Sequence, residues 1–280
     1  MTCDYEFGEF TFQSQPLCEG GSQAKIYTGK DLQTGKPVAV KVFNRIHNAA
    51  FRREIAAMKR LKGKGNICEA VGASISPYSS AIAMPIYDCD LFQYAFEDNN
   101  KLRVNEVRRV FKQICVGVFN MHSAGVAHMD LKPENILFKR ESKSVAICDF
   151  GFSCITEDKQ KKIRVPFTSC GTVEYQAPEV TKSYTLNPFP ADIYSLGCIL
   201  YVLLVGCFPA FREYDGELYI PSSMDLPRNS ADFLLQTLAY DPAARPTIQQ
   251  ALEHPFLQDS QPLGAFARFW KRSFDKIKKI

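Results

Sequence analysis

The sequence predicts an α+β fold in two lobes, with a small antiparallel sheet in the N-terminal lobe and a mainly helical C-terminal lobe. The first observation is that residues 9–42 alternate short β-type runs with turn-forming segments. The second is that the chain after about residue 92 has apolar residues at helical spacing, in 103–123, 191–206, 231–240 and 247–254. One amphipathic helix is predicted earlier, at 49–61, and the joint between the lobes is predicted at "MPIYDCD", 84–90.

The composition indicates a globular chain whose charge is concentrated at one end. Of the 280 residues, 46% are hydrophobic and 23% are charged, which is typical of soluble globular proteins. The net charge is +4, and residues 263–280 hold six Lys or Arg and one Asp, a sum of +5 that leaves −1 for the rest. A nearly neutral body does not favour nucleic-acid binding.

The cysteines and the apolar runs favour a cytoplasmic protein, with a nuclear location as the alternative. The ten cysteines contain no Cys-x-x-Cys pair, so reduced thiols fit better than a zinc ribbon or a disulfide framework. The first ten residues lack the basic and apolar order of a signal peptide. The longest apolar run, 198–211, is too short and too interrupted to span a bilayer and predicts a buried helix.

A lysine and a glutamate could form an ion pair in the first lobe. Lys41 ends the predicted strand "VAVK", and Glu54 follows on the predicted helix. A lysine between buried strand residues usually has a partner, and Glu54 could reach it if the helix packs on the sheet. The alternative is an exposed lysine at a strand end.

Two later segments carry the residue types of a phosphate and magnesium site. "HMDLKPENILF", 128–138, places Asp130, Lys132 and Asn135 in one loop, and "CDFG" follows with Asp149. Magnesium prefers oxygen ligands, often one or two carboxylates with phosphate and water. A second carboxylate can accept a proton or orient a nucleophile. Either motif alone would also fit ordinary loop-capping residues, but together they predict such a site.

The chain resembles the eukaryotic protein kinase catalytic domain of the Ser/Thr type. It contains, in this order, VAVK, Glu54, HMDLKPEN, CDFG, GTVEYQAPE (171–179), DIYSLG (192–197) and DPAARPT (241–247). The resemblance implies a catalytic domain, with ATP and Mg²⁺ as cofactors. The expected bounds of the domain are 10–260 (N-lobe 10–84, hinge 85–90, C-lobe 91–260), and residues 261–280 are expected to form a basic amphipathic tail.

The resemblance implies a role for each residue of the site. Asp130 would accept the proton of the attacking hydroxyl, and Lys132 would neutralise charge on the transferred phosphoryl group. Asn135 and Asp149 would bind magnesium ions. Lys41 would hold the phosphates of ATP, with Glu54 as its anchor, within a nucleotide-binding set that comprises Gly20, Gly21, Ala24, Ile26, Ala39, Lys41, Glu54, Met84 and Leu137.

The resemblance also implies three internal supports. Asp192 would brace the catalytic loop, and Glu179 would form a buried ion pair with Arg245. A stacked apolar column of active kinases is matched by His128, Phe150 and Met58.

The substrates that the resemblance implies are proteins with Ser or Thr. Lys132 and the "GT" of 171–172 are typical of Ser/Thr kinases, and Phe152 favours Ser. Val202 stands where kinases that select basic substrates often have Glu, although Asp90 could still favour a basic residue. A kinase for small molecules is disfavoured by "GTVEYQAPE".

The phosphate-binding loop departs from the family pattern. Counting back from Lys41, Ile26 takes the place of the Val that covers adenine, which puts the three glycine positions at Glu19, Gly21 and Ala24. A second frame uses Cys18, Gly20 and Gly21. Fewer glycines give the backbone less freedom, so weaker or slower nucleotide handling is expected. A pseudokinase-like scaffold that binds nucleotide or partners is the alternative function.

Met129 departs from the family at a regulatory position. Most regulated kinases have Arg there, which pairs with a phosphate on the activation loop. Because Met carries neither charge nor donor, we expect activity that is largely independent of activation-loop phosphorylation. Sites that could still be phosphorylated are Thr156, Thr168 and Ser169.

Two segments near the C-terminus bear on partners. Only residues 212–220 separate "GCFPAF" from Pro221, so a helix that often docks substrates and partners is predicted to be missing or reduced to a turn. The tail has one apolar face, formed by Leu263, Phe266, Trp270, Phe274 and Ile277. It could contact an anionic membrane, bind a calmodulin-like regulatory protein, or dock on its own lobe.

Overall fold

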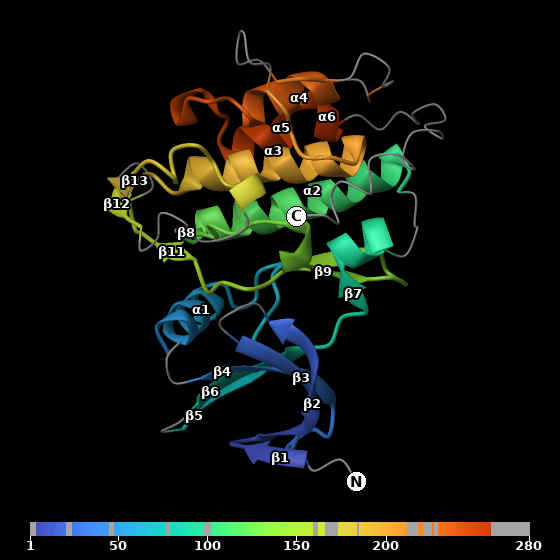
Figure 1. The fold of residues 1–280 in the computed structure, drawn as a ribbon, viewed down its shortest axis with the longest axis vertical. Helices are drawn as coiled ribbons and strands as arrows, with labels where there is room; N and C mark the ends of the chain where they lie inside the picture. Colours follow the sequence, from blue (N-terminus) through green and yellow to red (C-terminus); the bar gives the residue numbers. More distant parts are fainter. Residues whose placement is uncertain are drawn as a thin grey trace.

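The computed structural model confirms the α+β class and the two lobes (Figure 1). A six-stranded antiparallel sheet with one helix forms the N-lobe, and the longest helices form the C-lobe. The structure describes residues 4–20, 24–44, 48–76, 79–97, 102–158, 162–165, 173–183, 185–211, 218–220, 226 and 229–258. Within these ranges, no helix has the length and apolar character needed to cross a membrane.

The N-lobe sheet has the order β1-β2-β3-β4-β6-β5. Its strands are β1 (Asp4–Phe7), β2 (Phe10–Gly20), β3 (Ala24–Asp31), β4 (Pro37–Asn44), β5 (Gly72–Ile75) and β6 (Ser79–Pro85). The turn between β3 and β4 is set by Asp31, whose carboxylate accepts from the backbone N–H of Gln33 at 2.8 Å, and by Gly35 with φ 68°. Strand β1 was not predicted, because its four residues are too few for a periodic pattern.

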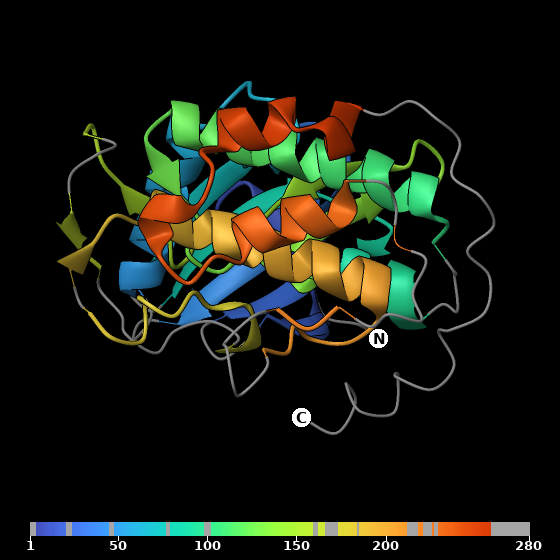
Figure 2. The same ribbon diagram turned by 90° about the horizontal axis from the view of Figure 1, so that it is seen from above.

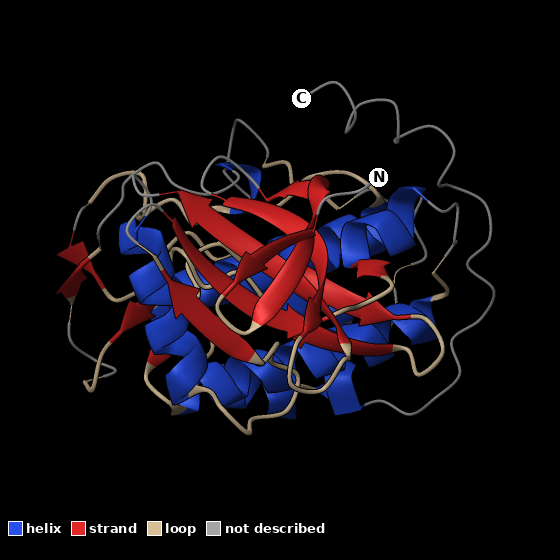
Figure 3. Ribbon diagram, turned by 90° about the horizontal axis from the view of Figure 1, so that it is seen from below, coloured by secondary structure: helices blue, strands red, loops and turns tan. Residues whose placement is uncertain are grey.

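The sheet curls strongly, as Figure 3 shows from below. Phe10 of β2 lies over β5, where a Cβ added to Gly72 would come within 2.5 Å of the phenylalanine ring. Only glycine leaves room for this close approach. The curled sheet encloses a small apolar core of its own, formed by Phe10, Val38, Val40, Ala81 and Ala83. On β4 the alternate residues face the other way, toward the C-lobe.

Helix α1 (Asn48–Arg60) matches the predicted helix at 49–61. Phe51, Glu54 and Met58 lie at spacings of three and four residues and are buried, while the polar face is exposed. The helix contacts β4 and β6. This packing carries Glu54 to the sheet face that holds Lys41.

The C-lobe is built around one buried helix. Its helices are α2 (Val104–Ser123), α3 (Phe189–Val205), α4 (Ser230–Thr237), α5 (Ile248–Glu253) and α6 (Pro255–Gln258). Every residue of α3 except Pro190 is buried, as expected for a helix that is apolar on all sides. Figure 2 shows α5 and α6 over α2, and α4 beside α3.

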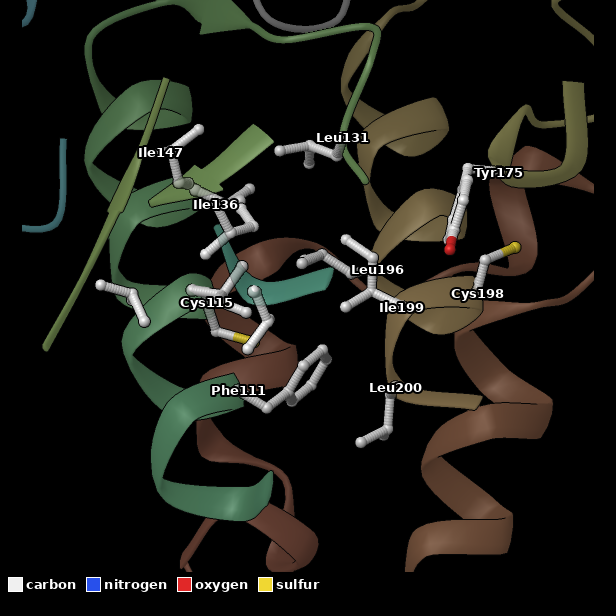
Figure 4. Close-up of a cluster of buried hydrophobic side chains, with 14 of the residues drawn as sticks. Phe111, Cys115, Leu131, Ile136, Ile147, Tyr175, Leu196, Cys198, Ile199 and Leu200 are labelled. Atoms are coloured by element: carbon white, nitrogen blue, oxygen red, sulfur yellow. The ribbon is translucent and has the colours of Figure 1, made fainter. Parts of the chain in front are cut away.

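Helices α2 and α3 meet in the core of the C-lobe (Figure 4). Phe111 and Cys115 of α2 point toward Leu196, Ile199 and Leu200 of α3, and all five side chains are at most 1% exposed. These two helices therefore form the platform on which the catalytic loop lies.

Several short strands were not predicted. They are β7 (Cys89–Asp90), β8 (Val126–Ala127), β9 (Ile136–Lys139), β10 (Ser144–Ile147), β11 (Cys154–Ile155), β12 (Ile163–Arg164) and β13 (Thr185–Leu186). Strand β7 pairs with β9, β9 with β10, β11 with β8, and β12 with β13. Runs of two to four residues give no usable alternation in the sequence. They are specified by tertiary pairing instead.

The segment after α3 contains no helix among its described residues, 207–211 and 218–220. Phe211 forms an isolated bridge with Leu218, and the hydroxyl of Tyr201 donates to the carbonyl of Tyr219 at 2.7 Å. The tail residues 261–280, with their predicted apolar face, lie outside the described residues, as do Gly21, Thr168 and Ser169.

The ion pair between Glu179 and Arg245 is present in the C-lobe. Arg245 Nη1 and Nη2 lie 2.6 and 2.9 Å from the two oxygens of Glu179. The same guanidinium donates to the carbonyls of Pro190, Ala239 and Tyr240 at 2.8–3.2 Å. Arg245 is 6% exposed and the side chain of Glu179 is 16% exposed, so this bidentate pair is largely buried and its arginine is bonded on several sides.

Replacement Arg245→Met is expected to lower the free energy of unfolding by about 3–5 kcal/mol, because the largely buried Glu179 would lose its cation and three carbonyls would lose their donor. The measurement is denaturant unfolding of the wild type and the variant. The double variant with Glu179→Met should recover part of the loss, because no unpaired charge is left, although the carbonyls of Pro190, Ala239 and Tyr240 still lack their donor. A double variant as unstable as the sum of both single changes would contradict this account.

Candidate active site

Lys41 lies between two carboxylates at the junction of the lobes. Its Nζ is 2.8 and 3.1 Å from the oxygens of Glu54 and 2.8 Å from Oδ1 of Asp149. Lys41 and Glu54 are 4% and 1% exposed, so the exposed strand-end lysine is excluded. Strand β4, helix α1 and the loop after β10 thus meet at one ammonium group.

The charges of this cluster shift one another's protonation. Burial raises the pKa of Glu54 to about 7, against the opposing effect of Lys41 and with the help of Asp149. Burial by itself would lower the pKa of Lys41, but the two carboxylates outweigh it and raise that pKa. Two carboxylates share one cation here, and the more deeply buried of them holds a proton most easily.

Glu54 is therefore expected to make folding stability depend on pH. Its pKa is about 7 in the folded chain against 4.5 in an exposed side chain, so the folded state binds this proton more tightly. Stability from this group is complete below pH 4.5 and is lost as the pH rises to about 7, on the order of 3 kcal/mol. Burial would raise the pKa of Asp149, but Lys41 outweighs it and lowers that pKa below its ordinary value of 3.8. Protonation of Asp149 therefore affects folding stability only below pH 3.8.

The measurement is the free energy of unfolding of the wild type and Glu54→Gln between pH 4.5 and 7.5. The difference between the two should grow with pH in favour of the variant, since glutamine does not titrate. A constant difference across this range would contradict a raised pKa at Glu54.

The catalytic loop brings Asp130, Asn135 and Lys132 together. Asn135 is held by the 3-10 helix η3 (Pro133–Asn135), and its Nδ2 donates to the backbone carbonyl of Asp130 at 2.7 Å and to Asp130 Oδ2 at 3.0 Å. Lys132 Nζ is 3.5 Å from the same Oδ2. Asp130 is 9% exposed. A carboxylate in this setting can accept a proton from a hydroxyl.

Asp192 braces this loop from below, as the resemblance implied. Its Oδ1 accepts from the backbone N–H of Met129, and its Oδ2 accepts from the N–H of His128, both at 2.8 Å. His122 of α2 also contacts Oδ2, at 2.9 Å. Met129 has φ 68°, a left-handed conformation that costs energy for a residue other than glycine. The carboxylate of Asp192 holds the backbone in that conformation.

His128 and Phe150 form the lower part of the apolar column. Their ring centroids are 5.3 Å apart, and both side chains are fully buried. His128 accepts from the N–H of Asp130 at Nδ1 and contacts the carbonyl of Cys148 through Nε2 at 2.9 Å, which requires the proton on Nε2. Met58 of α1 belongs to the same buried cluster.

The predicted nucleotide residues of the N-lobe share one face of the sheet. Lys41 of β4 pairs with Ile26 of β3, and Ala39 of β4 pairs with Met84 of β6. Residues directly opposite in an antiparallel pair point to the same side. Leu137 comes from β9 of the C-lobe and packs against the core to which Met84 belongs. The four N-lobe side chains therefore lie on one face of the sheet.

The structure places the remaining loop residues at the end of a hairpin. Gly20 closes β2 opposite Ala24 of β3, with Ile26 two residues further along β3. Gly21 lies in the connection between these strands, outside the described residues.

The donor set fits a magnesium ion bound together with phosphate. Asp149 supplies a carboxylate whose side chain is 33% exposed. Asn135 uses Nδ2 for both of its bonds to Asp130, so its Oδ1 is the atom that could face a cation. No group of three or more His, Cys, Asp and Glu side chains converges among the described residues, so the other ligands would come from phosphate and water.

Sequence reasoning missed two residues of this site. Arg53 of α1 donates through Nε to the carbonyl of Gly151 at 2.8 Å, and His122 contacts Asp192. The sequence shows both residue types, but no spacing rule links Arg53 to a residue 98 positions later.

A groove of about 370 Å³ lies between α1 and β5. Its apolar lining includes Phe51, Ile55 and Ile75, with Lys59 and Lys62 at its margin. Neither Lys41, Asp130 nor Asp149 lines it, so this groove is separate from the site.

Comparison with known proteins finds a matching family model and relatives over most of the chain. A family model described as protein kinase domain matches residues 15–257. The chain is 36% identical over 223 residues to CBL-interacting serine/threonine-protein kinase 15 of Arabidopsis thaliana, which covers 77% of this chain and 50% of the relative. It is 30% identical over 272 residues to CBL-interacting protein kinase 31 of Oryza sativa subsp. japonica, covering 92% and 60%.

A similar level of identity is found outside plants. The chain is 29% identical over 266 residues to myosin light chain kinase family member 4 of Homo sapiens, which covers 89% of this chain and 67% of the relative. The chain thus spans between half and two thirds of the length of these relatives.

Proposed function

Because the chain belongs to the protein kinase family, we propose that it is a serine/threonine kinase that transfers the γ-phosphate of ATP to protein hydroxyls. The observation that carries this proposal is the ion pair between Lys41 and Glu54, at 2.8 Å, beside the Asp130–Asn135 loop. The named serine/threonine kinases among the relatives support it.

Each residue of the site has a task in this proposal. Bound Mg-ATP would supply the phosphoryl group, and the metal would neutralise its charge. Lys41 would hold phosphate oxygens, with Glu54 keeping its ammonium in place. Asn135 and Asp149 would hold the metal. Asp130 would accept the proton of the attacking hydroxyl, and Lys132 would stabilise negative charge on the transferred group.

The test is transfer from Mg-ATP to a peptide library that contains Ser, Thr and Tyr, with the modified residues identified by mass spectrometry. We expect label on Ser and Thr only. Label on Tyr alone would contradict the substrate class. Nucleotide binding without any transfer would favour the alternative, which is a pseudokinase-like scaffold or a kinase that a partner must activate. The incomplete set of glycines in the phosphate-binding loop is the observation that favours this alternative.

Acidic residues near Asp130 support a preference for basic substrates. Burial raises the pKa of Glu134, Lys132 opposes this effect, and Asp90 and Asp130 add to it, so two further carboxylates lie near Glu134. Val202, at the position where basic-directed kinases often have Glu, is 1% exposed and contributes none. We expect Arg or Lys to be enriched before the phosphoacceptor in the peptide library.

Independence from activation-loop phosphorylation is the regulatory part of the proposal. Phosphatase treatment is expected to leave activity unchanged, because Met129 carries no cation that a phosphate must neutralise. Met129→Arg should lower the activity of the dephosphorylated protein by roughly tenfold, since it adds a partly buried charge that costs about 1–3 kcal/mol. The measurement is the initial rate before and after phosphatase treatment, with phosphorylation checked by mass spectrometry. A wild type that loses its activity with its phosphate would refute this.

Three further parts of the proposal rest on the sequence. The catalytic domain is proposed to span 10–260, and the tail 261–280 is proposed as a contact for a membrane or a partner helix. A regulatory protein partner is supported by relatives named for their interaction with CBL. The cytoplasmic location rests on the cysteines, of which Cys68, Cys89, Cys115, Cys148, Cys154, Cys198 and Cys207 form no disulfide.

A further inference from the structure

Arg53 links helix α1 to the loop that carries Asp149. It directly precedes Glu54, and its Nε donates to the carbonyl of Gly151 at 2.8 Å. The two residues are 98 positions apart and belong to different lobes. Two adjacent residues of α1 therefore make different contacts: Glu54 pairs with Lys41, and Arg53 donates a hydrogen bond to the loop that carries Asp149.

These contacts close a ring of polar interactions. Gly151 donates its N–H to Asp149 Oδ1 at 3.3 Å, and the same oxygen lies 2.8 Å from Lys41 Nζ. Lys41 binds Glu54, which is covalently joined to Arg53, and Arg53 returns to Gly151. The ring joins β4, α1 and the loop after β10, so none of these three elements can shift without breaking an ion pair or a hydrogen bond.

The ring acts where the backbone needs support. Asp149 has φ 62°, a left-handed conformation that costs of order 1–3 kcal/mol for a residue other than glycine. Both backbone polar groups of Gly151 are bound, its N–H by Asp149 and its carbonyl by Arg53. Arg53 thereby fixes the turn that aims the Asp149 carboxylate.

A second arginine on the same face of α1 anchors its other end. Arg60 lies two turns after Arg53, and its Nε donates to the carbonyl of Ala124, where α2 ends. Its Nη2 also lies 2.8 Å from Glu157. A cation at the carboxyl end of a helix is stabilising. The pair with Glu157, whose side chain is 82% exposed, adds little.

We propose that Arg53 is a positioning residue of the kinase site, which holds the Asp149 loop against α1 without a phosphate. This inference rests on the proposed function, and it accounts for Met129. Where an arginine at position 129 would need a phosphate, this chain uses an arginine on α1 whose acceptor is a backbone carbonyl. That acceptor is always present, so the arrangement is assembled on folding.

The test compares Arg53→Met with Arg53→Lys and with Arg52→Met, all dephosphorylated. Arg52 is the matched control, because it is the exposed neighbour on the same helix. The first readout is amide hydrogen exchange of residues 148–155 without nucleotide. The second is the Mg²⁺ concentration for half-maximal transfer at saturating ATP, and the third is the melting temperature.

For Arg53→Met we expect faster exchange in 148–155 and a requirement for roughly tenfold more Mg²⁺, the usual effect of losing a residue that orients a metal ligand. Arg53→Lys should restore part of both, because it keeps a donor. Arg52→Met should match the wild type. A merely structural role would lower the melting temperature and leave the Mg²⁺ requirement unchanged.

Two results would overturn the inference. One is that Arg53→Met and Arg52→Met give the same exchange rates in 148–155. The other is that Arg53→Met changes exchange only in α1 and leaves the Asp149 loop as in the wild type. A wild type without transfer activity would refute the proposed function instead, and the exchange measurement would still decide whether Arg53 holds the loop.

Discussion

Asp130→Asn is expected to reduce phosphoryl transfer by about 10²–10⁴-fold, the range that a positioned general base contributes. Asparagine has the same shape as aspartate, so Nδ2 of Asn135 can still donate to the side chain, as it does now at 3.0 Å. What is lost is the negative charge that would accept the proton of the substrate and pair with Lys132. The change should therefore act on the rate of the chemical step.

The measurement is kcat and KM for ATP, with the melting temperature as a check on folding. KM for ATP should change little, because Lys41, Glu54 and Asp149 remain. Glu141→Gln is the matched control, since Glu141 is an exposed carboxylate on the turn between β9 and β10. It should behave as the wild type. Retained transfer by Asp130→Asn would mean that another group accepts the proton.

The sequence predicted the site more fully than the sheet around it. The resemblance identified four site residues directly, because they belong to short motifs whose order along the chain is typical of protein kinases. They are Lys41, Asp130, Asn135 and Asp149. Their geometry follows from local structure that the motifs also specify, such as the 3-10 turn at Pro133–Asn135. The helices were predictable for another reason. The longer ones, α1, α2 and α3, have enough turns to show an apolar period, whereas the four-residue α6 was not predicted.

What the sequence could not predict depends on contacts between distant residues. The two-residue strands β8 and β11 exist because Cys154 and Ile155 pair with Ala127 and Val126, and no local pattern encodes that pairing. The bond from Arg53 to Gly151 has the same character. Positions 52 and 53 are both arginine, and only the packing of α1 decides which of the two side chains faces the site.

The left-handed residues show a third limit. Met129 and Asp149 have φ values of 68° and 62°, in a region where glycine is the usual signal. Neither methionine nor aspartate in a sequence predicts a left-handed conformation. It is stabilised by the hydrogen bond that Met129 donates to Asp192 and by the one that Gly151 donates to Asp149, which become visible only in three dimensions.

Lys41→Met is expected to abolish transfer and to lower the free energy of unfolding by about 3–5 kcal/mol, because it leaves Glu54 buried without a cation. Glu54 is 1% exposed, and burial already raises its pKa to about 7 in the presence of Lys41. Without Lys41 that carboxyl should be protonated at neutral pH. The loss of stability should therefore be smaller at pH 5 than at pH 8, which denaturant unfolding at the two values can test.

The double variant with Glu54→Gln separates stability from catalysis. Glutamine cannot ionise, so Lys41→Met combined with Glu54→Gln should recover most of the lost stability, with a coupling energy well above the 0.5 kcal/mol that independent sites show. Transfer should stay absent, because no ammonium is left to hold phosphate. If the double variant were active, Lys41 would serve only to neutralise Glu54. If it were as unstable as the sum of the single changes, the ion pair would not be what holds α1 on the sheet.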